Sequence, residues 1–157
     1  MNLVAAIIWG FGATVVLTTL LRASQSLGLT RIDLPFILGS AFTANRDRAK
    51  ALGYGIHLLN GWAFALFYCA AFETYGEADV LLGALIGFVH GAFVLIVGMP
   101  ALPAFHPRMA PETWGPEPAR QLEPPGNLAL NYGWSTPLVT LAAHILFGAI
   151  LGAFYTV

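Results

Sequence analysis

The apolar residues of this chain gather into four long runs that are separated by more polar stretches. These runs contain no Asp, Glu, Lys or Arg, and they cover residues 3–21, 51–72, 80–99 and 137–157. A helix rises about 1.5 Å per residue, so each run is long enough to cross most or all of a hydrocarbon layer about 30 Å thick. The pattern therefore predicts an all-α integral membrane protein, in which residues 1–157 form one membrane domain built as a four-transmembrane-helix bundle.

The connection 22–50 carries a further apolar segment, Leu34–Phe42, which has the spacing of a one-sided helix. This segment is too short to span a membrane. We therefore expect a short interfacial helix after the first span, lying flat on the membrane surface or under the bundle. Asp33 is placed to cap this helix, and Asn45 is placed to cap the helix of the second span.

The other two connections differ sharply from each other. Residues 73–79 form a very short acidic turn, whereas residues 100–136 are rich in proline. Proline removes a backbone donor and restricts the residue before it, so little regular structure is expected through this second stretch. The sequence predicts that Pro100 ends or kinks the third span and that an extended loop precedes the fourth.

The second and fourth runs share a pattern of small residues behind a histidine. The second run reads His57-Leu-Leu-Asn-Gly61-Trp-Ala-Phe-Ala65-Leu-Phe67-Tyr68, and the fourth reads His144-Ile-Leu-Phe-Gly148-Ala-Ile-Leu-Gly152-Ala-Phe154-Tyr155. A weaker echo links Gly12–Leu17 with Gly91–Ile96. The agreement predicts two helical hairpins related as parallel repeats about an axis along the membrane normal. Glycines at helical spacing are the expected packing positions: Gly61, Gly83, Gly87, Gly91, Gly148 and Gly152.

The composition agrees with lipid as the surrounding solvent. Hydrophobic residues make up 57% of the chain and charged residues 10%, which is too few to give most helices a polar face. A net charge of −1 gives no basic surface for nucleic acid. The lone cysteine, Cys69, excludes both an intrachain disulfide and a CxxC motif. The expected partners are the lipid bilayer and either further copies of the chain or another membrane protein.

All seven Lys and Arg residues lie in the connections 22–50 and 100–136. An even number of spans places these two connections on the same side of the membrane. The positive-inside rule makes that side cytoplasmic, with both termini outside. The predicted location is the bacterial cytoplasmic (inner) membrane.

Polar groups inside a membrane are costly and are therefore the first candidates for function. In the spans these are His57, Asn60, His90 and His144. The leading interpretation is that each histidine hydrogen-bonds to a carbonyl or hydroxyl on the next helix and fixes the register of the bundle, with Thr14, Thr18 and Thr140 available as partners. Two alternatives stay open. The histidines could ligate a haem or a transition metal, with Asn60 orienting His57, or they could line a path for protons or ions.

A second candidate cluster lies in the proline-rich connection. His106, Arg108 and Trp114 combine aromatic, basic and imidazole side chains, which could bind a lipid head group or a partner protein. A simple connection is the more common role of such a loop.

The chain resembles a group of small bacterial four-span inner-membrane proteins that have no assigned activity. The resemblance lies in Leu34-Pro35 after the first span, in the His57 to Gly61 opening of the second, and in His106-Pro107 after the third. It covers most of the chain and implies the four-span fold, but it implies no activity.

No phosphate-binding glycine loop of the Walker type and no nucleophile elbow occurs in the sequence, which makes an enzyme the less favoured class. The leading hypothesis is a non-catalytic accessory or scaffold component of the membrane, without a cofactor. The alternatives are a transporter or channel with a histidine-lined path and, next, a histidine-ligated haem or metal protein.

Overall fold

The computed structural model describes residues 1–111 and 118–157, and within these ranges the chain is helical and has no strand. The elements in order are α1 (Leu3–Ser26), α2 (Leu34–Ser40), α3 (Arg46–Tyr75), α4 (Val80–Phe93), the π-helical segment η1 (Val94–Gly98), α5 (Met99–Phe105), the 3-10 helix η2 (Asn127–Tyr132) and α6 (Thr136–Phe154). Trp114, a candidate from the sequence, lies outside the described residues.

Four helices are long and apolar enough to cross a membrane: α1, α3, the continuous Val80–Phe105 helix and α6. Their outer surfaces carry large apolar side chains that are exposed, among them Ile8 on α1, Phe67 on α3 and Leu81 on α4. Apolar surface on this scale would be unfavourable in water. The all-helical fold with four candidate spans agrees with the prediction and indicates a multi-pass membrane protein.

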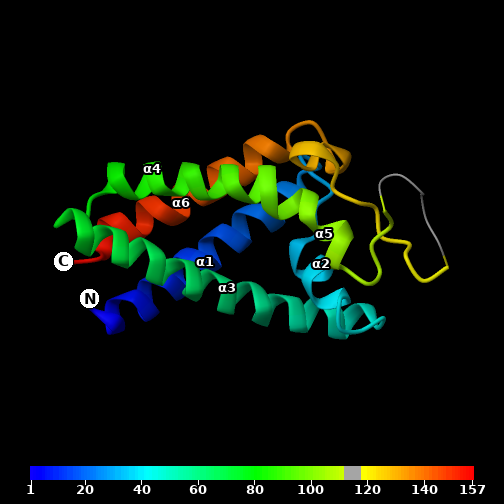
Figure 1. The fold of residues 1–157 in the computed structure, drawn as a ribbon, viewed down its shortest axis with the longest axis horizontal. Coiled ribbons are helices and arrows are strands. Elements are labelled where there is room, and N and C mark those ends of the chain that lie inside the picture. Colours follow the sequence, from blue (N-terminus) through cyan, green and yellow to red (C-terminus); the bar gives the residue numbers. More distant parts are fainter. Residues whose placement is uncertain (112–117) are drawn as a thin grey trace.

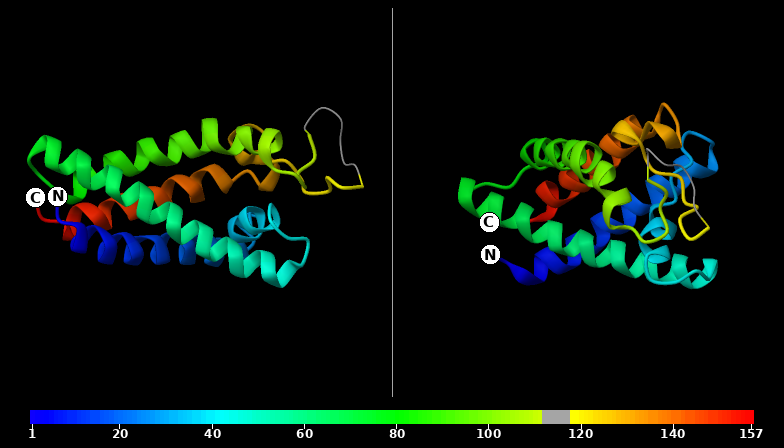
Figure 2. Two further views of the ribbon diagram at one scale, coloured as in Figure 1. Left: turned by 60° about the horizontal axis from the view of Figure 1, so that its bottom comes forward. Right: turned by 45° about the vertical axis from the view of Figure 1, so that its right-hand side comes forward.

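The two central helices are α1 and α6, which lie side by side, with α3 flanking α1 and α4 flanking α6 (Figure 1). From their shared turn, α3 and α4 diverge toward the opposite end of the bundle (Figures 1 and 2). Both termini lie at the end with this turn, and α2, α5 and the proline-rich connection lie at the other end. We call these the terminal end and the loop end.

The contact between α4 and α6 is close because glycines face glycines. A Cβ built on Gly83 would lie 2.1 Å from the carbonyl oxygen of Gly148, and one built on Gly148 would lie 2.0 Å from that of Gly83. The neighbouring turns behave alike, since a Cβ on Gly87 would lie 2.2 Å from the carbonyl oxygen of His144. The backbones therefore touch directly, which only glycine permits at these positions.

The contact between α1 and α3 also uses small residues, but here the glycines meet side chains and not carbonyls. A Cβ on Gly61 would lie 1.9 Å from Thr14 Oγ1, and one on Gly10 would lie 2.8 Å from the Cβ of Ala65. The indole nitrogen of Trp62 donates a hydrogen bond of 2.9 Å to the carbonyl of Ile7 and closes the outer side of this crossing.

The short helix α2 packs against the start of α3. A Cβ on Gly39 would lie 1.7 Å from the carbonyl oxygen of Ala49, so the two backbones meet there as well. Both predicted caps are confirmed: Asp33 accepts a hydrogen bond from the Phe36 amide at 3.2 Å, and Asn45 accepts one from the Arg48 amide at 3.0 Å.

Of the two outcomes that the sequence predicts at Pro100, an end is wrong, because the third long helix passes through Pro100 and ends only at Phe105. The π-helical segment η1 explains how the helix accommodates Pro100. The amide of Met99 bonds to the carbonyl of Val94, five residues earlier, so the turn is widened just before the proline. Proline has no amide hydrogen to place in that turn. The expected loop is also shorter than predicted, because α5 occupies its start and η2 its end.

Candidate functional site

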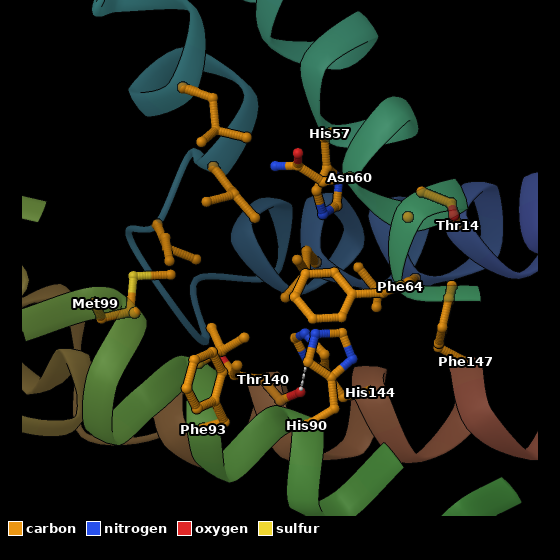
Figure 3. A pocket seen from close by; sticks show the side chains of 18 of the residues that line it. Thr14, His57, Asn60, Phe64, His90, Phe93, Met99, Thr140, His144 and Phe147 are labelled. Atoms are coloured by element: carbon orange, nitrogen blue, oxygen red, sulfur yellow. Dashed lines mark hydrogen bonds between the residues drawn. The ribbon is translucent and has the colours of Figure 1, made fainter. Parts of the chain in front are cut away.

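The three histidines of the spans meet at one cavity inside the bundle, with a volume of about 240 Å³ (Figure 3). The cavity lies where α3 and α4 diverge, and every long helix contributes to its wall. Its lining residues are Thr14, Leu17, Leu21, Ile32, Leu34, Leu38, His57, Asn60, Gly61, Phe64, His90, Phe93, Val94, Gly98, Met99, Leu102, Thr140, His144 and Phe147.

His57 is held by a threonine of α1. Its Nδ1 lies 3.0 Å from Thr18 Oγ1, and the same hydroxyl donates to the carbonyl of Thr14 at 2.7 Å. A hydroxyl has one hydrogen, and a carbonyl can only accept. The Nδ1–H of His57 is therefore the donor to Thr18, and Nε2 keeps its lone pair.

His144 is fixed by its own helix. Its Nδ1 lies 2.8 Å from the carbonyl oxygen of Thr140, one turn earlier, so Nδ1–H is the donor and Nε2 of the neutral ring is again an acceptor. The hydroxyl of Thr140 is buried without a hydrogen-bond partner among the described residues. The cavity wall thus contains an unpaired hydroxyl one turn from an imidazole acceptor.

The side chain of His90, on α4, lies against α3, the other flanking helix. Its Nδ1 is 3.1 Å from the hydroxyl of Tyr68 on α3, and its ring stacks on Phe64 with centroids 4.0 Å apart. The ring also meets that of His144 edge-on, with centroids 4.7 Å apart. Tyr68 and Phe64 are thus the side chains of α3 that reach α4 across the cavity.

The structure brings together His57, His90 and His144 but gives Asn60 no hydrogen bond to His57, whose partner is Thr18 instead. Sequence reasoning did not single out Tyr68 as the partner of His90, or the unpaired hydroxyl of Thr140. The Phe-Tyr that ends the repeated pattern was the available signal for Tyr68, whereas Thr140 was expected only as a hydroxyl available to a histidine.

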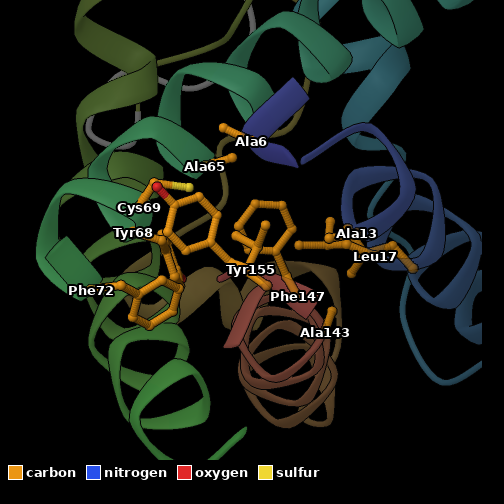
Figure 4. Close-up of a cluster of buried hydrophobic side chains, with 12 residues drawn as sticks. Ala6, Ala13, Leu17, Ala65, Tyr68, Cys69, Phe72, Ala143, Phe147 and Tyr155 are labelled. Carbon is orange, nitrogen blue, oxygen red and sulfur yellow. The ribbon is translucent and has the colours of Figure 1, made fainter. Parts of the chain in front are cut away.

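The cavity has a polar part and an apolar part, and among the described residues no charged side chain lines it. The imidazoles and Thr140 lie near its middle, and the loop-end portion is lined by Ile32, Leu38 and Leu102 among other apolar side chains. Toward the terminal end the bundle is filled by a cluster of buried side chains that includes Tyr68, Phe72, Phe147, Leu151 and Tyr155 (Figure 4).

The histidines of the cavity do not form a three-ligand metal site in the described part of the chain. Across residues 1–111 and 118–157, no group of three or more His, Cys, Asp or Glu side chains is arranged to hold a metal ion. The cavity, at about 240 Å³, is smaller than the roughly 300–1,000 Å³ of pockets that hold drug-sized ligands.

The second candidate cluster connects the loop to α2. Nε2–H of buried His106 donates to the carbonyl of Ile37 at 2.9 Å, and Nδ1 accepts from the Arg108 amide at 3.2 Å. The guanidinium of Arg108 donates to the carbonyl of Ser40. Both side chains thus bind carbonyls of α2 and hold the connection against this helix.

No family model, curated protein or solved structure matches this chain.

Proposed function

We propose that this protein is a non-catalytic membrane protein that binds a small, mainly apolar molecule in the cavity between α3 and α4. The single observation that carries the proposal is the cavity itself, about 240 Å³ in a bundle whose α4–α6 and α2–α3 crossings bring backbone against backbone. Protein interiors seldom leave voids larger than a water molecule, and binding sites are typically apolar with few polar groups. An accessory or scaffold role in the membrane is compatible with such a bound molecule.

The arrangement gives less support to the alternatives. A transport path would have to continue to the terminal end, where Tyr68, Phe72 and Phe147 are fully or almost fully buried in contact with their neighbours. A three-histidine metal site would require side-chain positions that the described residues do not offer. Binding requires only the cavity and a way into it.

The proposal places the protein in the bacterial cytoplasmic membrane with the loop end in the cytoplasm. The support is that all seven Lys and Arg residues fall in the two connections at that end, away from both termini. In this orientation α2 lies at the cytoplasmic interface. In a Cys69→Ala background, an impermeant maleimide added to intact cells is expected to label Glu77→Cys and not Ala44→Cys; the reverse result would contradict this orientation.

The two-hairpin repeat is also part of the proposal, with α1 and α3 as one unit and α4 and α6 as the other. In both units the helices cross in the same register. The facing pairs are Gly10 with Ala65, Thr14 with Gly61 and Thr18 with His57, and then Asp79 with Gly152, Gly83 with Gly148 and Gly87 with His144. These pairs support matching Thr14 to Gly83, in place of the sequence echo of Gly12 with Gly91.

The test of binding uses a ten-carbon alkane that carries a photoreactive diazirine, added to purified protein. We expect saturable labelling of peptides from α5 and α6. Gly98 lines the cavity, and a Cβ there would meet no atom within 4 Å, so Gly98→Leu should fill the cavity without a clash and abolish the saturable part.

Gly55 is the matched control. It also has no atom within 4 Å of an added Cβ, and it lies on the outer surface, so Gly55→Leu should label as the unchanged protein does. Labelling that never saturates, or that is equal in the two variants, would remove the proposed function.

A further inference from the structure

The hydroxyl of Thr140 is an exception among the threonines of the spans. On α1, the hydroxyls of Thr14, Thr18 and Thr19 each donate to the carbonyl four residues earlier, at 2.6–2.7 Å. That of Thr74 on α3 does the same at 2.8 Å. This bond is the ordinary way for a helix to satisfy a threonine in an apolar medium.

Thr140 is only 2% exposed and lines the cavity, yet its hydroxyl has no partner among the described residues. A buried polar group without a hydrogen bond is costly, and such groups in native proteins call for an explanation. The explanation nearest at hand is a group that is bound in the cavity.

The histidine side chains determine which hydrogen-bond donors and acceptors the bound group must have. His144 and His57 both donate a hydrogen bond from Nδ1–H to a protein oxygen. In each neutral ring, Nε2 therefore remains as an acceptor. An acceptor is satisfied by a donor. One turn away, Thr140 has a hydroxyl hydrogen to give. A single hydroxyl group on the ligand can donate to Nε2 of His144 and accept from Thr140, because a hydroxyl donates one hydrogen bond and accepts others.

The charge of the cavity wall limits the class of ligand further. In the ranges 1–111 and 118–157, no Asp, Glu, Lys or Arg lines the cavity, so an ionic head group there would be buried without a counter-charge from these residues. The loop-end portion of the wall is apolar, with Leu38, Met99 and Leu102. That portion suits a short hydrocarbon tail, while the polar atoms lie deeper in the bundle (Figure 3).

Resting on the proposed binding function, we infer that the ligand is a neutral amphiphile with a hydroxyl group, an alcohol or a phenol. Its hydroxyl donates to Nε2 of His144 and accepts from Thr140, and its apolar part lies toward α2 and α5. An ordered water could offer the same hydroxyl chemistry, so the experiment has to separate an amphiphile from water.

Three probes with the same ten-carbon chain make this separation: 1-decanol, its methyl ether and decane. Each competes with the diazirine alkane, and concentrations are expressed as mole fractions in the micelle to remove differences in partition. The alcohol can donate and accept, the ether can only accept, and decane can do neither. We expect the alcohol to bind about 3- to 10-fold more tightly than the ether, and the ether more tightly than decane by a similar factor.

Thr140→Val is the informative variant, because the Oγ1 that it removes makes no hydrogen bond within the described protein. We expect the ether to lose its advantage over decane in Thr140→Val, decane affinity to stay unchanged, and Thr140→Ser to restore the advantage. Equal affinity for alcohol and ether in the unchanged protein would overturn the inference, as expected if water fills the polar part. An ether advantage that persists in Thr140→Val would also overturn it.

These failures differ from failure of the proposed function. If decane still competes and Gly98→Leu still blocks it, the cavity binds apolar molecules and only the hydroxyl requirement is wrong. If the diazirine alkane never gives saturable labelling, both the binding function and the inference are wrong.

Discussion

Adding one methyl group at Gly83 should force α4 and α6 apart. Its Cβ would lie 2.1 Å from the carbonyl oxygen of Gly148, whereas ordinary contact begins near 3.4 Å. The two backbones would have to separate by about 1.3 Å, because no flexible side chain is present to move aside. Overpacking of this kind lowers the free energy of unfolding by about 2–3 kcal/mol, and the higher helix propensity of alanine offsets about 1 kcal/mol of this loss. We therefore expect Gly83→Ala to lower the free energy of unfolding by about 1–2 kcal/mol.

Gly12 provides the matched control on α1, since a Cβ there meets no atom within 4 Å. Gly12→Ala should leave stability unchanged or raise it by up to about 1 kcal/mol. The measurement is unfolding in mixed micelles of increasing SDS mole fraction, followed by far-ultraviolet circular dichroism. If the two variants unfold at the same SDS mole fraction, the backbone contact between α4 and α6 is not as described.

The double variant sharpens the test. In Gly148→Ala the new Cβ would lie 2.0 Å from the carbonyl oxygen of Gly83, so both substitutions push the same two helices apart. Once one methyl group has separated them, the second meets less resistance. Gly83→Ala with Gly148→Ala should thus cost less than the sum of the two single variants. Strict additivity would contradict a shared crossing point.

Three further predictions concern groups outside the cavity. Asp33→Asn keeps the cap of α2 and loses only partly exposed ion pairs, so it should cost at most about 1 kcal/mol, whereas Asp33→Ala should cost about 1 kcal/mol more in the same SDS titration. Tyr155→Phe removes a 2.7 Å hydrogen bond to Glu73 and should lower the free energy of unfolding by about 1–2 kcal/mol. Burial, assisted by the negative charge of Glu123, raises the pKa of Tyr132, so the neutral phenol favours the folded state; stability should fall as pH rises above about 10, and less so in Tyr132→Phe.

The general architecture could be predicted from the sequence because lipid imposes a simple rule. Long uncharged runs must be helical to satisfy their backbone, so the four candidate spans follow directly from composition. The caps at Asp33 and Asn45 could also be predicted, since a capping side chain acts within one turn of its own helix.

The details of the cavity depend on contacts between helices, which a single sequence does not encode locally. Asn60 was a reasonable partner for His57 by spacing, but the partner in the structure is Thr18, one of the three threonines available to the histidines in the sequence. The π-helical turn before Pro100 is likewise set by packing, and no residue in Val94–Gly98 predicts it from the sequence. Histidine and glycine spacing indicated which helix faces matter, and it did not indicate which atoms meet.

The central position of α6 bears on how the chain assembles. This helix follows α1, α3 and α4 in the order of synthesis, yet it is the element that joins the α1 side of the bundle to the α4 side. Trp9 near the start of α1 stacks on Phe154 at the end of α6, with ring centroids 4.2 Å apart. The contact between α1 and α3 can form while translation continues, whereas the glycine face of α4 has no partner on α6 until α6 has been made. Closure of the whole bundle is thus a late, long-range event in the biogenesis of this protein.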